Sequence, residues 1–333
     1  MRLLNFQPVS IIVISYNCSS YTRQCLDSFL TASNGLIGEV IVVDNGSTDG
    51  TVEMIRDKFK AVRILVNARN EGYANAVNTG VKEACGSFVI VTNADVIMDL
   101  DSISFMTDYL KRNPKVGIAG PQQVFPDGRW QRSYGDVPGL LCSIKNLLGI
   151  TSARHFLRTL TWPWFRWDRR AREVGYVDGA VMAIRREAFE DVGGFDENFF
   201  FYGEDADFCM RLRKAGWKVV FLPKARVIHV RGGCSTKVCP DDRFLRLQVQ
   251  SNVLFLKKHY PEWKVCLVLV LQLGYCKLRK FASRLLSFLT SKGMYKFFRS
   301  REEVFSVLSI LWAEQLRQFK SSIQSRVEKC AKN

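Results

Sequence analysis

VSIIVIS, at residues 9–15, is an unbroken run of apolar and β-branched residues. Such a run is typical of a strand that is buried on both faces of a parallel sheet. Alternating helix and strand patterns follow it, at residues 21–32, 39–43, 48–59, 62–66, 73–84 and 87–92. This alternation predicts an α/β fold with a doubly wound, mostly parallel sheet, whose ligands bind at the carboxyl ends of the strands.

Polar residues directly follow three of these strands. They are Ser15-Tyr16-Asn17, Asp44-Asn45 and Asn93-Ala94-Asp95. Turn chemistry explains any one of these clusters by itself, because Asp, Asn and Gly are frequent in turns. Three clusters at equivalent strand ends favour a binding site.

The two aspartates in these clusters each allow two interpretations. Asp95 follows a strand and is a suitable ligand for a divalent metal, but a helix cap or turn explains it equally well. Asp44 can accept a hydrogen bond from the imide N–H of a pyrimidine base. Its alternative is a turn in which Asn45-Gly46 supplies the positive φ angle.

The densest acidic group is Glu204-Asp205-Ala206-Asp207, which opens a helix pattern at residues 205–215. Helix capping accounts for one or two of these acids. It does not account for the four aromatic residues that come directly before them, at 199–202. An apolar wall shields a carboxylate from water, so this cluster is a candidate source of a general base.

His229 ends a strand-like stretch at residues 225–230. A lone histidine is more often structural than a metal ligand. A metal role for it therefore requires that Asp95 lie nearby.

The region from 128 to 173 lacks clean periodicity and is rich in arginine and tryptophan, including WPWFRW at 162–167. Tryptophan suits sugar stacking and bilayer interfaces equally well. The segment is therefore either an acceptor-binding flap or a membrane contact. Regular patterns resume at 176–185, a helix starts near Glu187, and a short strand is expected at 218–221.

The formal net charge of +16 indicates an anionic partner. Residues 263–333 contain fourteen Lys and Arg residues and four Asp and Glu residues, so this segment has a net charge of +10. We expect a catalytic domain at 1–262, with an insert at about 129–173, and a basic amphipathic tail at 263–333. Apolar stretches at 265–276 and 304–312 would insert shallowly in an anionic membrane surface. Packing of these helices on the catalytic core is the alternative.

Ten scattered cysteines without a C-x-x-C pair favour free thiols in a reducing, cytoplasmic setting. The run at residues 265–276 is too short to span a bilayer. We therefore expect a peripheral enzyme at the inner face of the cell membrane.

With these residues in view, the chain resembles glycosyltransferase family 2, and within it the rhamnosyltransferase-like bacterial enzymes. The matching segments include IIVISYN (11–17), EVIVVDNGSTDGT (39–51), NEGYANAVNTG (70–80), VIVTNADV (89–96) and the stretch from 176 to 217 that contains GEDAD. They cover about two thirds of the chain, to about residue 236.

The resemblance implies a GT-A fold and an inverting, single-displacement transfer of a sugar from a nucleoside diphosphate. It implies that Asp44 reads the donor base, that Asp95 and His229 bind Mg²⁺ or Mn²⁺, and that Asp205 deprotonates the acceptor. Glu204 and Asp207 would support this site. The nucleotide slot would be lined by Ser15, Tyr16, Asn70, Gly72 and Asn93.

One motif departs from the usual pattern, because N-x-D (Asn93 to Asp95) replaces D-x-D. Rhamnosyltransferase-like members of the family often have N-x-D at this position, and the change removes one negative charge from the metal site. The expected partners are a dTDP- or UDP-sugar and a glycan or polyprenyl-linked acceptor in cell-surface polysaccharide synthesis.

Three other functions have weaker support. The charge permits nucleic-acid binding, but no nucleic-acid module is recognisable, and we expect no such partner. A sugar nucleotidyltransferase needs a glycine-rich phosphate loop, whereas SYNCSSYTRQC (15–25) has no glycine. A dehydrogenase needs G-x-G-x-x-G after the first strand, which is missing.

Overall fold

The computed structural model describes residues 9–30, 35–161, 170–234, 241–289 and 292–330. The chain forms two compact units. The first combines Met1–Val137 with Leu157–Val238, and the second combines Pro138–Phe156 with Cys239–Asn333. The predicted WPWFRW flap lies outside the described residues.

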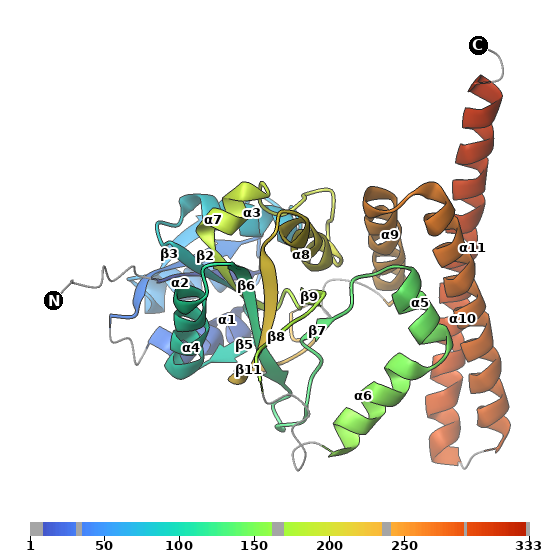
Figure 1. The fold of residues 1–333 in the computed structure, drawn as a ribbon. Helices are drawn as coiled ribbons and strands as arrows, with labels where there is room; N and C mark the ends of the chain where they lie inside the picture. The colour runs from blue at the N-terminus through green and yellow to red at the C-terminus, as the bar shows by residue number, and fades with distance from the viewer. Residues whose placement is uncertain (1–8, 31–34, 162–169, 235–240, 290–291, 331–333) are drawn as a thin grey trace. The chain divides into compact units, whose positions relative to one another are not determined.

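A nine-stranded mixed sheet forms the centre of the first unit (Figure 1). Its order is β3-β2-β1-β4-β10-β6-β11-β5, with β8 paired to β11, and β7 and β9 form a separate pair. The bounds are β1 (Val9–Ser15), β2 (Ile37–Asp44), β3 (Arg63–Val66), β4 (Phe88–Asn93), β5 (Val96–Met98), β6 (Val116–Val124), β7 (Tyr134–Gly135), β8 (Arg172–Glu173), β9 (Tyr176–Val177), β10 (Val181–Arg185) and β11 (Lys218–His229).

Successive side chains along the buried strands point to opposite faces of the sheet and pack into two separate hydrophobic cores. In β1, Ile11 and Val13 face one apolar cluster, and Ile12 faces the other. Helices α1 (Ser19–Leu30), α2 (Thr51–Lys58) and α4 (Leu100–Arg112) contribute to the first cluster. Helices α3 (Tyr73–Glu83), α7 (Arg186–Asp191) and α8 (Glu204–Lys214) contribute to the second. Two-sided burial explains why these strands read as continuous apolar runs.

The predicted α/β class with a mostly parallel sheet is confirmed, although several local expectations were wrong. Strands β1, β2, β3 and β4 are mutually parallel, whereas β10 runs antiparallel to both of its neighbours. The stretch 176–185 is two strands interrupted at Asp178, and 218–229 is one strand with a register shift between Leu222 and Arg226. The sequence patterns did not reveal α4 and β6.

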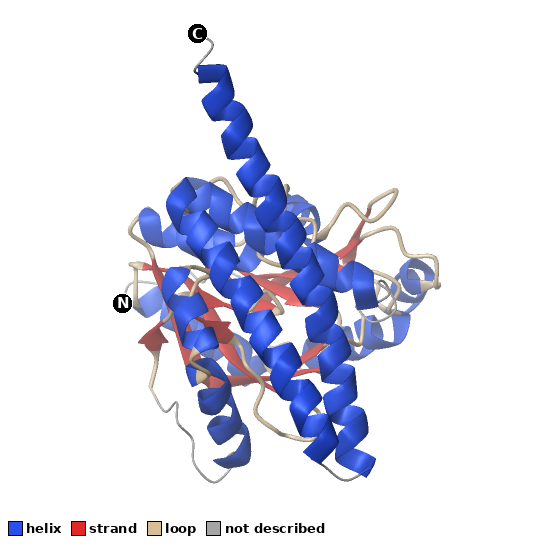
Figure 2. Ribbon diagram, turned by 90° about the vertical axis from the view of Figure 1, so that its right-hand side faces the viewer, coloured by secondary structure: helices blue, strands red, loops and turns tan. Residues whose placement is uncertain are grey.

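The second unit is helical. It comprises α5 (Leu140–Leu147), part of α6 (Ile150–Thr161), α9 (Asp241–His259), α10 (Glu262–Leu289) and α11 (Lys292–Cys330). Helices α10 and α11 run side by side (Figure 2) and share a core that includes Leu269 and Trp312. Within the described residues, none of the helices combines the length and the apolar character that a membrane crossing requires. Helices α5 and α6 lie within the stretch 128–173, where the sequence has no clean periodicity.

Candidate active site

The turn between β4 and β5 places Asp95 at the carboxyl end of the central strands. The side chain is 5% exposed, and the backbone carbonyl accepts a hydrogen bond from Val230 N at 2.9 Å. This bond ties the turn to the end of β11, which carries His229. Asp95 therefore lies where a doubly wound sheet binds its ligands.

Asp95 and His229 face each other inside the protein. The Nε2 atom of His229 lies 3.5 Å from Oδ1 of Asp95, and the histidine is 7% exposed. Cys234 N donates to the other carboxylate oxygen at 3.4 Å, whereas Oδ1 is buried without a hydrogen-bond partner among the described atoms. The condition for a metal role of His229, that Asp95 lie nearby, is met.

The donor atoms of this pair fit a divalent cation. A buried carboxylate oxygen without a hydrogen-bond partner is costly unless a cation or a donor approaches it. Among the described residues, no group of three or more His, Cys, Asp and Glu side chains is arranged to hold a metal. Mg²⁺ is commonly held by one or two protein ligands together with substrate phosphates and water. Two protein ligands are therefore sufficient for this kind of site.

Asp205 occupies the first turn of α8, beside the turn at Asp178. Its Oδ2 accepts a hydrogen bond from Gly179 N at 3.2 Å, and its Oδ1 accepts one from Ala206 N at 2.7 Å. Burial, and secondarily the charge of Asp178, raise the pKa of Asp205 to about 7. A carboxylate with this pKa is a stronger base than an ordinary aspartate and is still substantially ionised at neutral pH.

The two other acids of the cluster have different surroundings. Burial and the neighbouring Asp205 raise the pKa of Glu204 well above its usual range, and its Oε2 atom is buried without a hydrogen-bond partner among the described atoms. Asp207 is buried and pairs with Arg211 one turn later, with an O–N distance of 2.8 Å. Asp207 therefore stabilises α8, whereas Glu204 keeps its proton to higher pH than an ordinary glutamate does.

The backbone before α8 is held in an uncommon conformation. Tyr202 has φ 69° and Gly203 has φ 84°, so two consecutive residues are left-handed. For a tyrosine this conformation costs roughly 1–2 kcal/mol. Such strain often accompanies functional sites, and here it sets the direction in which Glu204 and Asp205 leave the aromatic segment.

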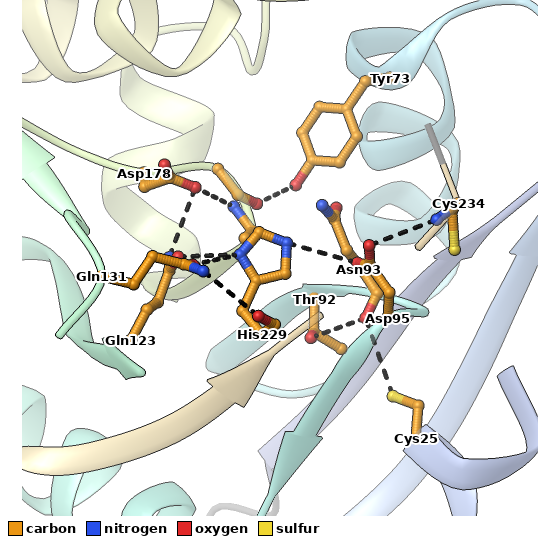
Figure 3. A network of polar contacts seen from close by, with 12 residues as sticks. Cys25, Tyr73, Thr92, Asn93, Asp95, Gln123, Gln131, Asp178, His229 and Cys234 are labelled. Carbon is orange, nitrogen blue, oxygen red and sulfur yellow. Dashed lines mark hydrogen bonds and ion pairs between the residues drawn. The ribbon is translucent and has the colours of Figure 1, made fainter. Parts of the chain in front are cut away.

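Polar contacts extend from the metal pair to Asp178, as Figure 3 shows, and continue to the candidate base through the next peptide unit. His229 Nδ1 is bonded to Gln123, and Gln123 Nε2 donates to Asp178 Oδ1 at 3.4 Å. Asp178 Oδ1 also accepts from Ala180 N at 3.0 Å, and the intervening Gly179 donates to Asp205. Tyr73 donates from its hydroxyl to the carbonyl of Gly179, which fixes the turn from the other side.

The sequence patterns did not identify Asp178, Gln123 or Gln131 as members of this network. Asp178 belongs to an Asp-Gly pair within the strand pattern at 176–185. Because Asp-Gly pairs are typical of turns, a turn at this position could have been predicted from the sequence. The two glutamines carried no signal, because their part in the network depends on how β6 and the returning chain pair in three dimensions.

The predicted base-reading residue is used in a turn. Asp44 is fully buried, and its two carboxylate oxygens accept hydrogen bonds from Ser47 N at 2.8 Å and Ser47 Oγ at 2.5 Å. Gly46 supplies the positive φ of 81°. The turn that the alternative interpretation required is therefore present. A base-reading role for Asp44 stays a prediction.

The remaining predicted donor residues lie at the same strand ends. Ser15 is buried and its hydroxyl lies 2.9 Å from that of Thr22, while Tyr16 follows it half-buried. Asn70 Oδ1 accepts from Gly72 N at 3.0 Å and from Asn45 Nδ2 at 3.1 Å. These contacts connect the loop after β3 to the loop after β2.

Gly72 and Asn93 complete the predicted slot. A Cβ atom on Gly72 would lie 2.8 Å from the carbonyl oxygen of Phe200, so only glycine allows this approach of the two loops. Asn93 ends β4 half-buried, and its backbone N–H donates to the carbonyl of Ala180 at 2.9 Å. The N-x-D motif thus lies directly against the turn that contacts Asp205.

Comparisons with known proteins found related families and related chains. The glycosyl transferase family 2 model matches residues 10–193, and a model described as the N-terminal domain of galactosyltransferase matches residues 166–232. An N-acetylglucosaminyl-diphospho-decaprenol L-rhamnosyltransferase of Mycobacterium tuberculosis is 32% identical over 273 residues, which are 76% of this chain and 85% of that protein.

Two solved structures share the fold. A mannosyltransferase of Pyrobaculum calidifontis, in complex with GDP-Man and Mn²⁺, aligns with a TM-score of 0.57 at 19% identity over 93% of this chain and 87% of its own. Glucosyl-3-phosphoglycerate synthase of Mycobacterium tuberculosis, with Mn²⁺ and UDP, aligns with a TM-score of 0.50 at 16% identity over 77% and 81% of the two chains.

Proposed function

The chain belongs to glycosyltransferase family 2, and from this premise we propose that it transfers a rhamnose-like deoxyhexose from a nucleoside diphosphate to a polyprenyl-diphosphate-linked glycan. The predicted family and enzyme class are confirmed. The specific sugar and acceptor rest on the name of the mycobacterial relative, an L-rhamnosyltransferase acting on N-acetylglucosaminyl-diphospho-decaprenol. Such a reaction belongs to cell-surface polysaccharide synthesis.

In the proposed chemistry, Asp205 removes the proton from the acceptor hydroxyl. The hydroxyl oxygen forms a bond to the anomeric carbon of the donor sugar while the bond from that carbon to the diphosphate breaks. This single displacement inverts the anomeric configuration. The raised pKa of Asp205, caused by burial and by Asp178, supports the assignment, because a base works best when its pKa is near the working pH.

We assign Asp95 and His229 as the protein ligands of Mg²⁺ or Mn²⁺. A bound divalent cation would neutralise the charge that develops on the leaving diphosphate. The two residues would hold it through Asp95 Oδ1 and His229 Nε2, the atoms that face each other at 3.5 Å. Because Asn93 replaces an aspartate, the site carries one negative charge fewer, and we expect weaker affinity for the cation in the absence of nucleotide.

The observation that carries the proposal is the continuous polar network from Asp95 through His229, Gln123 and Asp178 to Asp205. These contacts connect the candidate cation site with the candidate base. Ser15, Tyr16, Asp44, Asn70 and Gly72 lie on the loops at the same strand ends, and we propose that these loops receive the nucleoside of a dTDP- or UDP-sugar.

We further propose that the second unit attaches to an anionic membrane surface. One face of α10 carries apolar side chains that are each at least 40% exposed. They are Trp263, Leu267, Val270, Leu278, Phe281, Leu285 and Phe288, named here the α10 stripe. At 100° per residue these positions lie within about 80° of arc, along ~38 Å of helix.

The α10 stripe is separate from the core-facing side of the helix. Val265, Val268, Leu269 and Cys276 are buried in the second unit, so the apolar run expected to insert is divided between core and surface. Basic residues such as Lys277 and Arg284 lie beside one edge of the stripe, and each basic residue near anionic lipid contributes about 1 kcal/mol. Apolar insertion combined with these charges supports peripheral attachment at the inner membrane face, beside a lipid-linked acceptor.

Donor binding tests the proposed function directly. Purified protein would be titrated with dTDP-, UDP- and GDP-sugars by calorimetry, with and without Mn²⁺, using wild type and Asp95→Ala. We expect a dTDP- or UDP-sugar to bind wild type only with Mn²⁺, and Asp95→Ala to lose that dependence together with most of the affinity. Equal binding with and without metal in both proteins would overturn the metal assignment.

A further inference from the structure

The imidazole of His229 is held by two buried amide side chains. Its Nδ1 atom lies 3.0 Å from Oε1 of Gln123 and 2.8 Å from Oε1 of Gln131. Both glutamines are 1% exposed, so water does not compete for these contacts. Neither residue takes part in the chemistry described above, yet both contact the proposed metal ligand.

A β-hairpin brings the two glutamines to the same place. Gln123 lies near the end of β6, and the chain turns back through a loop closed by the bonds of Phe125 N to Arg129 O and Gly128 N to Phe125 O. On its return, Gln131 N donates to Gln123 O at 3.2 Å. The two side chains therefore approach the ring from adjacent positions in paired backbone.

The far end of each amide fixes its orientation. The Nε2 atom of Gln131 donates to the backbone carbonyl of His229 at 3.3 Å, and that of Gln123 donates to Asp178 at 3.4 Å. A carbonyl and a carboxylate only accept hydrogen bonds, so each NH₂ group must point to them. Each amide oxygen is then left facing the ring.

Two amide oxygens at Nδ1 determine which ring nitrogen carries the hydrogen. Since both oxygens are acceptors, Nδ1 must be the donor. In the neutral ring, Nε2 then presents its lone pair toward Asp95 Oδ1, which is also an acceptor and has no hydrogen-bond partner among the described atoms. Two lone pairs facing each other at 3.5 Å suit a cation that binds both.

We propose that Gln123 and Gln131 are positioning residues that hold His229 in its Nδ1-protonated tautomer, so that Nε2 is the atom offered to the divalent cation. This inference rests on the proposed use of Asp95 and His229 as metal ligands. An amide is required at both positions, because each side chain accepts from the ring at one end and donates at the other. A second role follows for Gln123, since its contact with Asp178 links the histidine to the turn beside Asp205.

The tautomer can be measured without activity or metal. The chain has three histidines, so labelling with ¹⁵N-histidine gives few resonances, and His155→Gln and His259→Gln identify the two that are not His229. At pH 8 an ordinary imidazole is neutral. We expect His229 to be Nδ1-protonated in the wild type. An Nε2-protonated or doubly protonated ring at that pH would overturn the proposal.

The role of the two glutamines is tested by the double variant Gln123→Met/Gln131→Met, which keeps side-chain length but removes both hydrogen-bond acceptors. Its control is Gln122→Met, at a neighbouring glutamine that is likewise buried, at 2% exposed, and bonds only to the backbone carbonyls of Gln123 and Gln131 among the contacts described. We expect the double variant to lose the Nδ1-protonated signature and the control to retain it. An unchanged His229 signature in a folded double variant would contradict the proposal. If the double variant does not fold, the single variant Gln131→Met is measured in the same way, and an unchanged ¹⁵N signature of His229 would contradict the proposal.

Binding of Mn²⁺ in the presence of UDP, and separately of dTDP, gives the second readout by electron paramagnetic resonance. Outer contacts to a metal-bound histidine typically contribute 10–100-fold to affinity, and we expect a loss of that size in the double variant and none in Gln122→Met. Equal Mn²⁺ affinity in double variant and wild type would overturn the positioning role. If wild type binds no Mn²⁺ with either nucleotide, the proposed function fails instead, and the tautomer result stands separately.

Discussion

Asp178 and Asp205 come from different elements but meet through one peptide unit, because the N–H of Gly179, the residue after Asp178, donates to Asp205 Oδ2 at 3.2 Å. Asp178 itself is bonded to Gln123, which contacts His229. The turn at 178–180 thus stands between the proposed metal site and the proposed base. Its negative charge also contributes to the raised pKa of Asp205.

Removing that charge should shift the pH dependence of transfer. With a pKa of about 7, Asp205 gains its base form as pH rises through neutrality, so kcat should rise between pH 6 and pH 8. Asp178→Asn removes a like charge, which lowers the pKa of Asp205 and moves this acid limb to lower pH, by about one unit. The measurement is kcat against pH for both proteins, and an unmoved acid limb would contradict the coupling.

Glu204 should cost stability at alkaline pH. Its pKa is raised in the folded state, mainly by burial, so the folded protein binds this proton more tightly than the unfolded chain does. Stability therefore falls as pH rises above the unfolded value of about 4.3. Glu204→Gln should increase the free energy of unfolding at pH 8 by about 1–3 kcal/mol, and by little near pH 4. Denaturant titrations at both pH values check this, and a gain of equal size at both would contradict it.

Gly72→Ala should damage both folding and donor binding. The substitution would place a Cβ atom 2.8 Å from a backbone oxygen of Phe200, at a φ of 91°. Gly50→Ala is the comparison, because Gly50 also has a positive φ, of 80°, with nothing within 4 Å of the added atom, although its ψ of 14° is left-handed helical and that of Gly72 is 168°, which glycine alone adopts readily. We expect Gly50→Ala to lose about 1 kcal/mol of stability and Gly72→Ala to lose clearly more. Thermal unfolding of the two variants compares them, and equal losses would show that the contact with Phe200 does not matter.

The α10 stripe should mediate vesicle binding. Phe281→Ser/Phe288→Ser changes two side chains that are 65% and 74% exposed, and we expect a reduction of sedimentation with vesicles of phosphatidylglycerol and phosphatidylcholine by tenfold or more. Phe105→Ser is the control, since Phe105 is 37% exposed on α4 of the first unit. Retained binding by the double variant, or an equal loss in the control, would place the membrane contact elsewhere.

Local signals predicted the part of the fold where strands are buried on both faces. The run VSIIVIS gave the bounds of β1 directly, because two-sided burial leaves no polar interruption. In contrast, β6 reads VGIAGPQQV, whose Gly, Pro and Gln residues conceal a fully buried strand. Gly117 and Gly120 are needed there because a Cβ atom would press on Trp217 and Val177, which are long-range neighbours.

The site was predictable only in part, for a related reason. Asp95, His229 and Asp205 belong to motifs whose sequence pattern carries the resemblance, so they could be singled out before their geometry was known. Gln123 and Gln131 acquire their role from hairpin pairing and from the position of His229 on another strand. No local periodicity encodes such a contact. Likewise, the division of the apolar residues of α10 between core and surface depends on which neighbours pack against the helix.

The division into a catalytic domain at 1–262 and a membrane-associating tail at 263–333 stays a prediction. In the structure, α9 (Asp241–His259) and α5 belong to the compact helical unit with α10 and α11. We propose that this whole unit, rather than the tail alone, forms the membrane-associating part.

The measurement that tests the central claim most directly compares donor binding and sugar transfer in Asp205→Asn. The substitution keeps shape and removes the base, so binding of the nucleotide sugar with Mn²⁺ should stay within about twofold of wild type. Transfer to a polyprenyl-diphosphate-linked glycan should fall by about 10³-fold or more, the order of effect that a general base contributes. Turnover at the wild-type rate in a variant with intact donor binding would show that Asp205 is not the base.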